Sequence, residues 1–295
     1  MMQFDQLVEL TVGGLAIGAI YGLIGLGFSM IIRATDILHF AQGEVMMLGA
    51  MFGWTVVMLV PLPFVAVLIV GMVFSGLSAG VIYLVIYRTL RIRHVPLMNI
   101  VIATIGVSIL LQNVSMLVWG SQPLAYPKLF AIETYRLGSV GFSPQMVWII
   151  ALGFGLMLLL QAFLAFTRTG IAMQAAAQDP ETAQLMGINL TRSTALTFAI
   201  GGAMAGAAGV LLGSMFFASF NMGFLTGIKA FVAATLGGVG SIGGAMLGGV
   251  IFGLIETFSP QWISSGYRDA VGMVLLILIL LALPQGLVGV FKRRR

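Results

Sequence analysis

Seven uncharged, largely apolar stretches restrict the fold of this chain more than any other feature. Charged residues make up 8% of the sequence and hydrophobic residues 60%, whereas soluble domains contain ~25% charged residues. Each stretch reaches the ~20 residues that an α-helix needs to cross ~30 Å of hydrocarbon. The stretches are 10–32, 45–87, 95–127, 137–167, 193–228, 230–255 and 270–291. The sequence therefore predicts an all-α, polytopic membrane protein.

The chain contains no cysteine. This excludes disulfides, thiolate metal sites and cysteine nucleophiles. The first ten residues include Asp5 and Glu9 but no basic residue, so they lack the basic region that begins a cleaved signal peptide. We therefore expect the first helix to remain as a membrane anchor.

Basic residues are concentrated in three places, and they predict the orientation of the chain. They lie at 88–93, at 168–192 and at 292–295. Because cytoplasmic loops are enriched in Lys and Arg, all three segments are expected on the cytoplasmic side. The N-terminus and the 121–143 connection are then periplasmic, and the C-terminus is cytoplasmic.

This arrangement predicts one transmembrane domain, 1–295, with eight or nine hydrophobic segments. About seven are full helices, and a Gly-rich hairpin accounts for the rest. The expected helices cover about 8–32, 40–60, 63–87, 96–120, 144–167, 193–216 and 270–290.

The hairpin is predicted at 229–257, where glycines interrupt the apolar sequence. The segment is too short for two full helices, so two shorter ones are expected to meet near Gly237, Gly238, Gly240 and Ser241. Broken helices of this kind indicate a substrate route in transporters. The alternative is that these glycines only allow close helix packing.

The most polar interior stretch has complete signals for a short helix at about 180–186. Asp179 suits the N-cap, Pro180 the first helical position, Glu181 the first turn and Gly187 the C-terminal end. Such a helix projects into the cytoplasm between two membrane helices. The alternative is an amphipathic helix resting on lipid headgroups, but the segment has few aromatic residues and no basic ones.

Several motifs give the chain a resemblance to a known family. The run 175–189 (AAAQDPETAQLMGIN) looks like the coupling loop of binding-protein-dependent ABC importer permeases. The runs 36–44 (DILHFAQGE), 203–209 (AMAGAAG), 236–245 (LGGVGSIGGA) and 284–289 (PQGLVG) are similar to the high-affinity branched-chain amino acid permeases of LivH type. The resemblance covers nearly the whole chain.

The resemblance implies a bacterial inner-membrane permease subunit that moves branched-chain or other small hydrophobic amino acids inward by alternating access. It implies four kinds of partner: a second homologous permease, two cytoplasmic ATPases, a periplasmic solute-binding protein and the lipid bilayer. No cofactor is expected on this chain. It has no GxxxxGK[ST] motif, so ATP and Mg²⁺ belong to the partner ATPases.

Site residues follow from these motifs and from polar groups within the membrane. ATPase coupling is assigned to Asp179, Pro180, Glu181, Leu185 and Gly187. A translocation path or gate is assigned to His39, Gln42, Glu44, Asn99, Gln112, Gly237, Gly238, Gly240, Ser241 and Glu256. Glu44 has an alternative explanation, because an acidic first turn stabilises a helix. For Lys229, near the outer end of the hairpin, an interfacial lysine that extends to the membrane surface is favoured over a substrate contact.

Other functions remain as alternatives. An intramembrane enzyme needs a clustered nucleophile and base, and the sequence shows none, so no catalytic or metal-binding residue is expected. An ion-coupled secondary transporter would use Glu44 and Glu256 as coupling groups. A permease of the same family for urea or short amides is a third alternative.

Overall fold

The protein is a bundle of long helices, and its computed structural model describes residues 4–127, 135–137, 140–261, 265–282 and 286–287. The longest α-helices are α1 (Phe4–Thr35), α2 (Gln42–Leu59), α3 (Phe64–Ile82), α5 (Leu97–Trp119), α6 (Pro144–Phe166), α9 (Leu190–Met215) and α11 (Ile242–Phe258). Shorter α-helices are α4 (Arg88–Ile92), α7 (Arg168–Gln178), α8 (Pro180–Leu185), α10 (Met222–Gly237) and α12 (Arg268–Ala282).

Five minor elements complete the described chain. A π-helical turn, Tyr83–Tyr87, joins α3 to α4, and two 3₁₀ turns, Ser259–Gln261 and Ser265–Tyr267, precede α12. Strands β1 (Tyr135–Leu137) and β2 (Val140–Phe142) pair antiparallel in the connection before α6.

Prolines mark several helix boundaries. Pro61 and Pro63 lie in the break between α2 and α3, and Pro96 precedes α5. Pro144 occupies the first turn of α6, whose N-cap Ser143 accepts a hydrogen bond from the Gln145 amide. Proline lacks the N–H that a helix interior needs but suits a first turn, so these boundaries follow from the sequence.

The predicted polytopic all-α fold is confirmed. Seven helical stretches in the described chain are long and apolar enough to cross a membrane, and six of them correspond to predicted full helices. The stretch that contains α11 belongs to the set, whereas the last helix, α12, has 15 described residues and is among the shorter ones. Helix α7 was not predicted. The charged tail, 292–295, lies outside the described residues.

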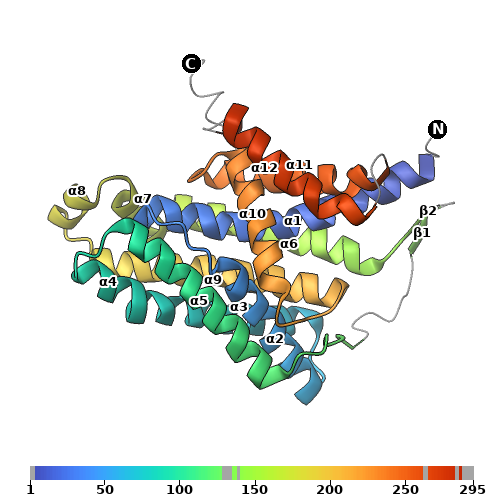
Figure 1. Ribbon diagram of the computed structural model, residues 1–295, viewed down its shortest axis with the longest axis horizontal. Coiled ribbons are helices and arrows are strands. Elements are labelled where there is room, and N and C mark those ends of the chain that lie inside the picture. The colour runs from blue at the N-terminus through green and yellow to red at the C-terminus, as the bar shows by residue number, and fades with distance from the viewer. Residues whose placement is uncertain (1–3, 128–134, 138–139, 262–264, 283–285, 288–295) are drawn as a thin grey trace.

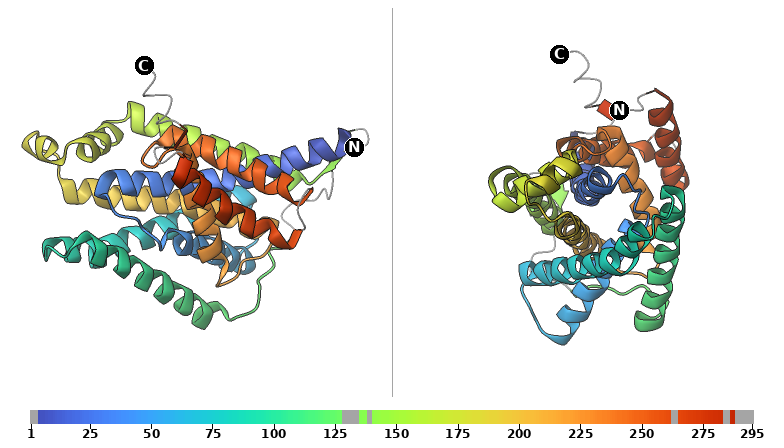
Figure 2. Two further views of the ribbon diagram at one scale, coloured as in Figure 1. Left: turned by 45° about the horizontal axis from the view of Figure 1, so that its top comes forward. Right: turned by 90° about the vertical axis from the view of Figure 1, so that its left-hand side faces the viewer.

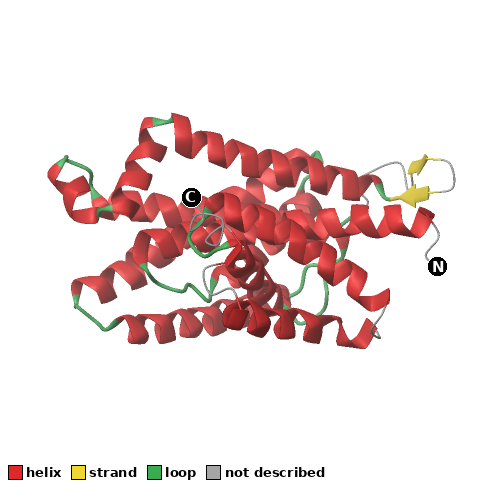
Figure 3. Cartoon of the chain, turned by 90° about the horizontal axis from the view of Figure 1, so that it is seen from above, coloured by secondary structure: helices red, strands yellow, loops and turns green. Residues whose placement is uncertain are grey.

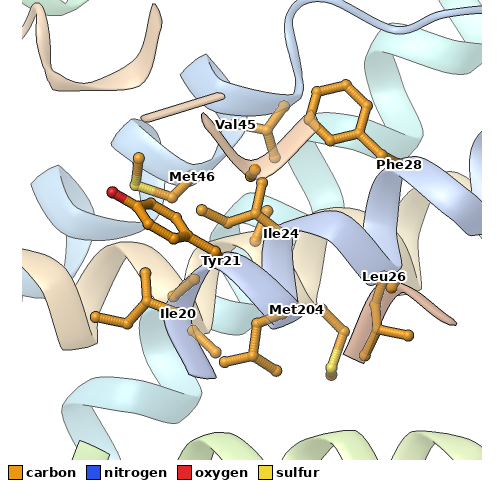
Figure 4. Packing of buried hydrophobic residues seen from close by; sticks show 14 of the residues in the cluster. Ile20, Tyr21, Ile24, Leu26, Phe28, Val45, Met46 and Met204 are labelled. Carbon is orange, nitrogen blue, oxygen red and sulfur yellow. The ribbon is translucent and has the colours of Figure 1, made fainter. Parts of the chain in front are cut away.

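Helix α1 is the centre of the bundle. It is buried on almost every side between α9, α11, α6 and α10. Figure 4 shows Ile20, Tyr21, Ile24 and Phe28 of α1 among the buried side chains of neighbouring helices. A helix that is apolar all round belongs inside a larger assembly of helices, which explains why α1 is enclosed.

Glycines allow α1 and α11 to lie in close antiparallel contact. A side chain at Gly18 would collide with the backbone of Val250, 2.8 Å away, and one at Gly249 would collide with Gly22. Small residues of this kind let membrane helices pack backbone to backbone. For α11, the interpretation as close packing is therefore supported.

The elements divide between two ends of the bundle. In Figure 1, α4, α7 and α8 lie at one end, whereas the N-terminus and strands β1 and β2 lie at the other. The second view of Figure 2 looks along the bundle from the α8 end and shows the helices grouped around α1. The basic segments 88–93 and 168–192 share the α8 end, as a single membrane orientation requires.

Helix α10 is an exception to this parallel arrangement. It runs steeply across α1 in Figure 1 and is seen nearly end-on in Figure 3. Its contacts explain the angle, because Gly25 of α1 packs against Ala230 and Ala234 of α10.

Candidate functional site

The segment 36–41 carries non-helical backbone into the interior of the bundle. Helix α1 ends at Thr35, but Gln42, the first residue of α2, packs against Gly27 of α1 and donates a 3.0 Å hydrogen bond from Nε2 to the Gly201 carbonyl. Gly27 lies ~12 Å before the end of α1 at the helical rise of 1.5 Å per residue. The chain therefore turns back into the bundle before α2 begins.

Side chains from α5 hold this irregular segment. The Phe40 amide donates to Thr104 Oγ1 at 3.2 Å, and the Thr104 hydroxyl lies 2.8 Å from the Val101 carbonyl and 3.4 Å from the Leu38 carbonyl. Irregular backbone at membrane depth occurs only where protein or a wet cavity surrounds it. Thr104 is itself fully buried, so protein provides the hydrogen bonds here.

Helix α10 begins at the same place from the opposite direction. The segment 216–221 leaves the far end of α9 and leads to α10, and its Ala218 is paired with Leu124. The first turns of α2 and α10 then meet at glycines. A side chain at Gly43 would overlap the Gly223 carbonyl and lie 2.9 Å from the Gly227 Cα. We call this meeting point the α2–α10 junction.

Glu44 lies in the α2–α10 junction and is 1% exposed. Its Oε1 accepts a 3.1 Å hydrogen bond from Ser108 Oγ of α5, and its Oε2 has no hydrogen-bond partner. A side chain at Gly223 would overlap Oε2, which places that oxygen against the first turn of α10. The predicted acidic first turn of α2 is present, but it is deeper in the bundle than the cytoplasmic surface where it was expected.

His39 and Gln42 are buried in the same stretch. His39 Nδ1 and the Tyr87 hydroxyl are hydrogen-bonded at 2.5 Å, and the two rings contact edge to face. His39 Nε2 and Gln42 Oε1 have no hydrogen-bond partner. His39, Gln42 and Glu44 each have one buried polar atom without a hydrogen-bond partner, and all three lie within the six residues 39–44. Buried polar groups normally have a partner.

The other predicted path residues do not gather at this junction. Asn99 is exposed near the start of α5, and Gln112 is half-buried. The hairpin of α10 and α11 turns at Gly238 to Ser241 as predicted, but a side chain at Gly240 would lie 3.8 Å from the Arg33 Cβ, near the end of α1. The deepest described break is therefore 36–41, and the hairpin turn lies closer to the end of the bundle.

Glu256 is part of a buried ion pair. Lys229 Nζ lies 2.6 Å from Glu256 Oε1 and 2.6 Å from Asp269 Oδ1. Lys229 is 8% exposed and Glu256 is 2% exposed, so the expected interfacial lysine is instead buried and paired. The three residues join α10, α11 and the beginning of α12.

The α8 end of the bundle consists of three helices that begin with their own side-chain caps. Thr167 accepts from the Gly170 amide at the start of α7, Asp179 from the Thr182 amide at the start of α8, and Asn189 from the Arg192 amide at the start of α9. The predicted helix at 180–186 is confirmed, and Gly187 ends it with a φ of +85°. We call 167–189 the α8 projection.

Electrostatics favour the ionised form of the Asp179 cap. The Thr182 hydroxyl donates to Oδ2 at 2.6 Å and the Thr182 amide to Oδ1 at 3.0 Å. These two hydrogen bonds hold the pKa of Asp179 below its usual value.

Apolar side chains are exposed at the tip of the projection. Leu185 is 88% exposed and Met186 78% exposed, and α8 extends away from the bundle in Figure 1. Cavities of about 570 Å³ and 430 Å³ lie on the two sides of the connection from Gly187 to Asn189. The projection is therefore an accessible shape with an apolar end.

Several residues that build the α2–α10 junction were not among the predicted site residues. Ser108, Thr104 and Tyr87 supply its hydrogen bonds, and Gly43 and Gly223 allow the helices to meet. A Ser, Thr or Gly in an apolar helix is too common to identify such a site. Only Gly43, a small residue directly before the intramembrane Glu44, could have indicated a close helix contact at this position. Among the described residues, no group of three or more His, Asp or Glu could hold a metal ion.

The long apolar helices, which enclose a buried irregular segment, define the class of a polytopic α-helical membrane protein. Residues 10–283 match the family described as the permease component of branched-chain amino acid transport systems. The chain belongs to this family.

Related permeases align with nearly the full length of this chain. The chain is 38% identical to the high-affinity branched-chain amino acid transport system permease protein LivH of Escherichia coli K12, over 97% of each chain. It is 37% identical to BraD of Pseudomonas aeruginosa, over 98% of each chain. A probable LivH of Methanocaldococcus jannaschii is 28% identical, over 91% of this chain and 88% of that protein. No solved structure matches the chain.

Proposed function

We propose that this permease carries branched-chain amino acids into the cell by alternating access, driven by ATP that separate ATPase subunits bind with Mg²⁺ and hydrolyse. The family match over 10–283 and the names of the relatives support this substrate class. The partners are a second homologous permease, two cytoplasmic ATPases and a periplasmic solute-binding protein.

The single observation that carries the coupling role is the capped helix α8. Pro180 and Glu181 form its first turn, and Leu185 and Met186 expose apolar surface at its end. Exposed apolar surface on a rigid element is typical of an interaction site. We assign Asp179, Pro180, Glu181, Leu185 and Gly187 to ATPase docking, with the two caps fixing the direction of α8.

The α2–α10 junction is assigned to the translocation path. Its buried polar atoms without partners, on His39, Gln42 and Glu44, support a role in contact with substrate or in gating. Asn99, Gln112, Gly237, Gly238, Gly240, Ser241 and Glu256 stay predictions for the path or gate. The junction also lies between two irregular segments that lead to opposite ends of the bundle, which suits a site of alternating exposure.

Reconstitution tests the transport function. The permease pair, the ATPases and the solute-binding protein are placed in proteoliposomes, and uptake of radiolabelled L-leucine is measured with and without ATP. ATP-dependent uptake of leucine is expected. Uptake by the permease alone under an ion gradient would favour a secondary transporter, and preferential uptake of urea or acetamide would favour the amide permeases.

Cysteine labelling tests the orientation in the bacterial inner membrane. The chain has no native cysteine, so Gln178→Cys and Ser121→Cys give single labels at exposed positions of the two ends. In intact cells, a membrane-impermeant thiol reagent is expected to label Ser121→Cys and to leave Gln178→Cys unlabelled. The reverse pattern would contradict the proposed periplasmic N-terminus and cytoplasmic C-terminus.

A further inference from the structure

The α2–α10 junction contains two uncapped helix N-termini. Ala41 at the start of α2 and Asn221 at the start of α10 make no side-chain capping hydrogen bond. The first four N–H groups of a helix have no partner within it, and the helix dipole adds partial positive charge there. Both helices are long enough for this effect, with 18 and 16 residues.

The unpartnered oxygen of Glu44 lies at the same position. Oε2 is buried against the first turn of α10 and accepts no hydrogen bond, while Oε1 accepts from Ser108. Among the described residues, the side-chain ion pairs with Lys or Arg are those of Lys229 with Glu256 and Asp269, so none involves Glu44. A buried carboxylate without a cation is costly, and a cationic ligand group would offset that cost.

Apolar side chains lie one or two helical turns from these polar groups. Met47, Leu48 and Met51 follow Glu44 on α2, Leu111 follows Ser108 on α5, and Met222 begins α10. They belong to one small cluster, and Leu111 and Met222 also pack against the main core of the bundle. Methionine is flexible and adapts to apolar groups of different shape.

We infer that the α2–α10 junction is an amino-acid binding site within the permease itself. Glu44 Oε2 takes the α-ammonium group. The N–H groups of the first turn of α10 take the α-carboxylate, except that of Met222, which donates to the Ser219 carbonyl. The cluster of Met47, Met51, Leu111 and Met222 takes a branched apolar side chain. The site thus recognises a zwitterion with an apolar substituent. This inference rests on the proposed transport function and names the residues that hold the substrate in transit.

Protection of a single cysteine tests the site without relying on transport. Met222→Cys is introduced into the assembled complex with its ATPases, and its labelling by N-ethylmaleimide is measured with and without L-leucine. L-Leucine is expected to slow labelling in a concentration-dependent manner. Two probes that lack one charge, 4-methylpentanoate without the ammonium and 3-methylbutylamine without the carboxylate, are expected to protect only at much higher concentrations.

Variants then identify Glu44 as the ammonium contact. Glu44→Gln is expected to raise the leucine concentration for half-protection about tenfold or more, the factor that corresponds to loss of one charge-assisted hydrogen bond. Glu44→Asp restores part of the protection. Ser115→Ala is the matched control, because Ser115 is also a buried serine of α5 but lies two turns from Ser108, and it keeps wild-type protection.

The outcomes separate this inference from the proposed function. Three results would each overturn the site and leave the transport function intact. The first is equal protection of wild type and Glu44→Gln, and the second is equal protection by leucine and 4-methylpentanoate. The third is no protection in a complex that imports leucine. If Glu44→Gln does not assemble, the two single-charge probes on the Met222→Cys complex still decide. A wild-type complex that does not import leucine with its binding protein would instead contradict the proposed function.

Discussion

Helices begin in both the α2–α10 junction and the α8 projection, but only the helices of the projection begin with side-chain caps. In the projection, Thr167, Asp179 and Asn189 each accept a hydrogen bond from an amide of the helix that follows. At the junction, neither α2 nor α10 has such a cap. The projection is therefore specified by local sequence, whereas the junction depends on contacts between distant segments.

The junction and the projection also differ in how much space surrounds their glycines. The junction is buried, and its helices meet backbone to backbone at glycines, so a side chain added at Gly43 or Gly223 must displace its neighbours. The projection is exposed, and added side chains at Gly187 meet nothing within 4 Å. Mutations at the junction should therefore act through packing, and mutations in the projection through backbone conformation.

The largest effect is expected from Gly43→Ala. Its Cβ would overlap the Gly223 carbonyl and approach the Gly227 Cα at 2.9 Å, and overpacking against backbone costs about 3 kcal/mol. We expect loss of folded complex or of uptake, measured by thermal unfolding in detergent and by leucine uptake. Gly106→Ala is the control, since a side chain there meets nothing within 4 Å. Wild-type stability of Gly43→Ala would show that the junction has room for an added methyl group and would contradict close packing of α2 against α10.

Gly187→Val should have a smaller effect, confined to the projection. Gly187 has a φ of +85°, and a side chain costs about 1–2 kcal/mol in the left-handed region. We expect normal insertion and thermal stability but weaker stimulation of ATP hydrolysis by substrate-loaded binding protein, because the end of α8 is redirected.

Gly187→Asn is the matched variant at the same position, because asparagine tolerates this conformation better than valine. It should retain most of the stimulation. If Gly187→Val stimulates and transports as wild type does, the projection is not the coupling element. Equal damage by valine and asparagine would indicate that side-chain volume matters there rather than backbone conformation.

These differences explain what the sequence could predict. The span positions followed from apolar length, and α8 followed from Asp179, Pro180 and Gly187, because caps act through neighbouring residues. The junction did not follow, although His39, Gln42 and Glu44 were selected as polar residues in an apolar chain. Their depth depends on Gly27, Gly43 and Gly223 coming together from distant segments. Neither helix propensity nor hydrophobic periodicity predicts contacts between glycines that are distant in the sequence.

The steep course of α10 was missed for the same reason. Its 16 residues and its glycine turn suggested half of a re-entrant hairpin, and the turn is present. Its angle, however, is determined by small residues that let it cross α1 at Gly25 and α2 at Gly43. The ion pair of Lys229 with Glu256 was missed because the two residues are separated along the chain and meet only when α10 folds against α11.

The smallest effect is expected from the pH dependence of α8. The pKa of Asp179 is held below its usual value by hydrogen bonds from Thr182, so the folded helix favours the ionised carboxylate. A group with a lowered pKa stabilises the folded state above its unfolded pKa of ~3.9 and loses that contribution as pH falls through its folded pKa. Protection of the Thr182 amide from hydrogen exchange should therefore be constant from pH 7 to about pH 5 and decline only below about pH 4.

Asp179→Asn and Asp179→Ala distinguish charge from capping. Asparagine can still accept the Thr182 amide hydrogen bond and should retain most of the protection at pH 7, but without the decline at low pH. Alanine removes the acceptor and should lower protection of Thr182 at every pH. The Asn189 cap of α9, whose acceptor does not titrate, provides an internal reference through the Arg192 amide. A parallel decline of both amides would mean that acid unfolds the whole projection and that the Asp179 carboxylate is not the titrating group.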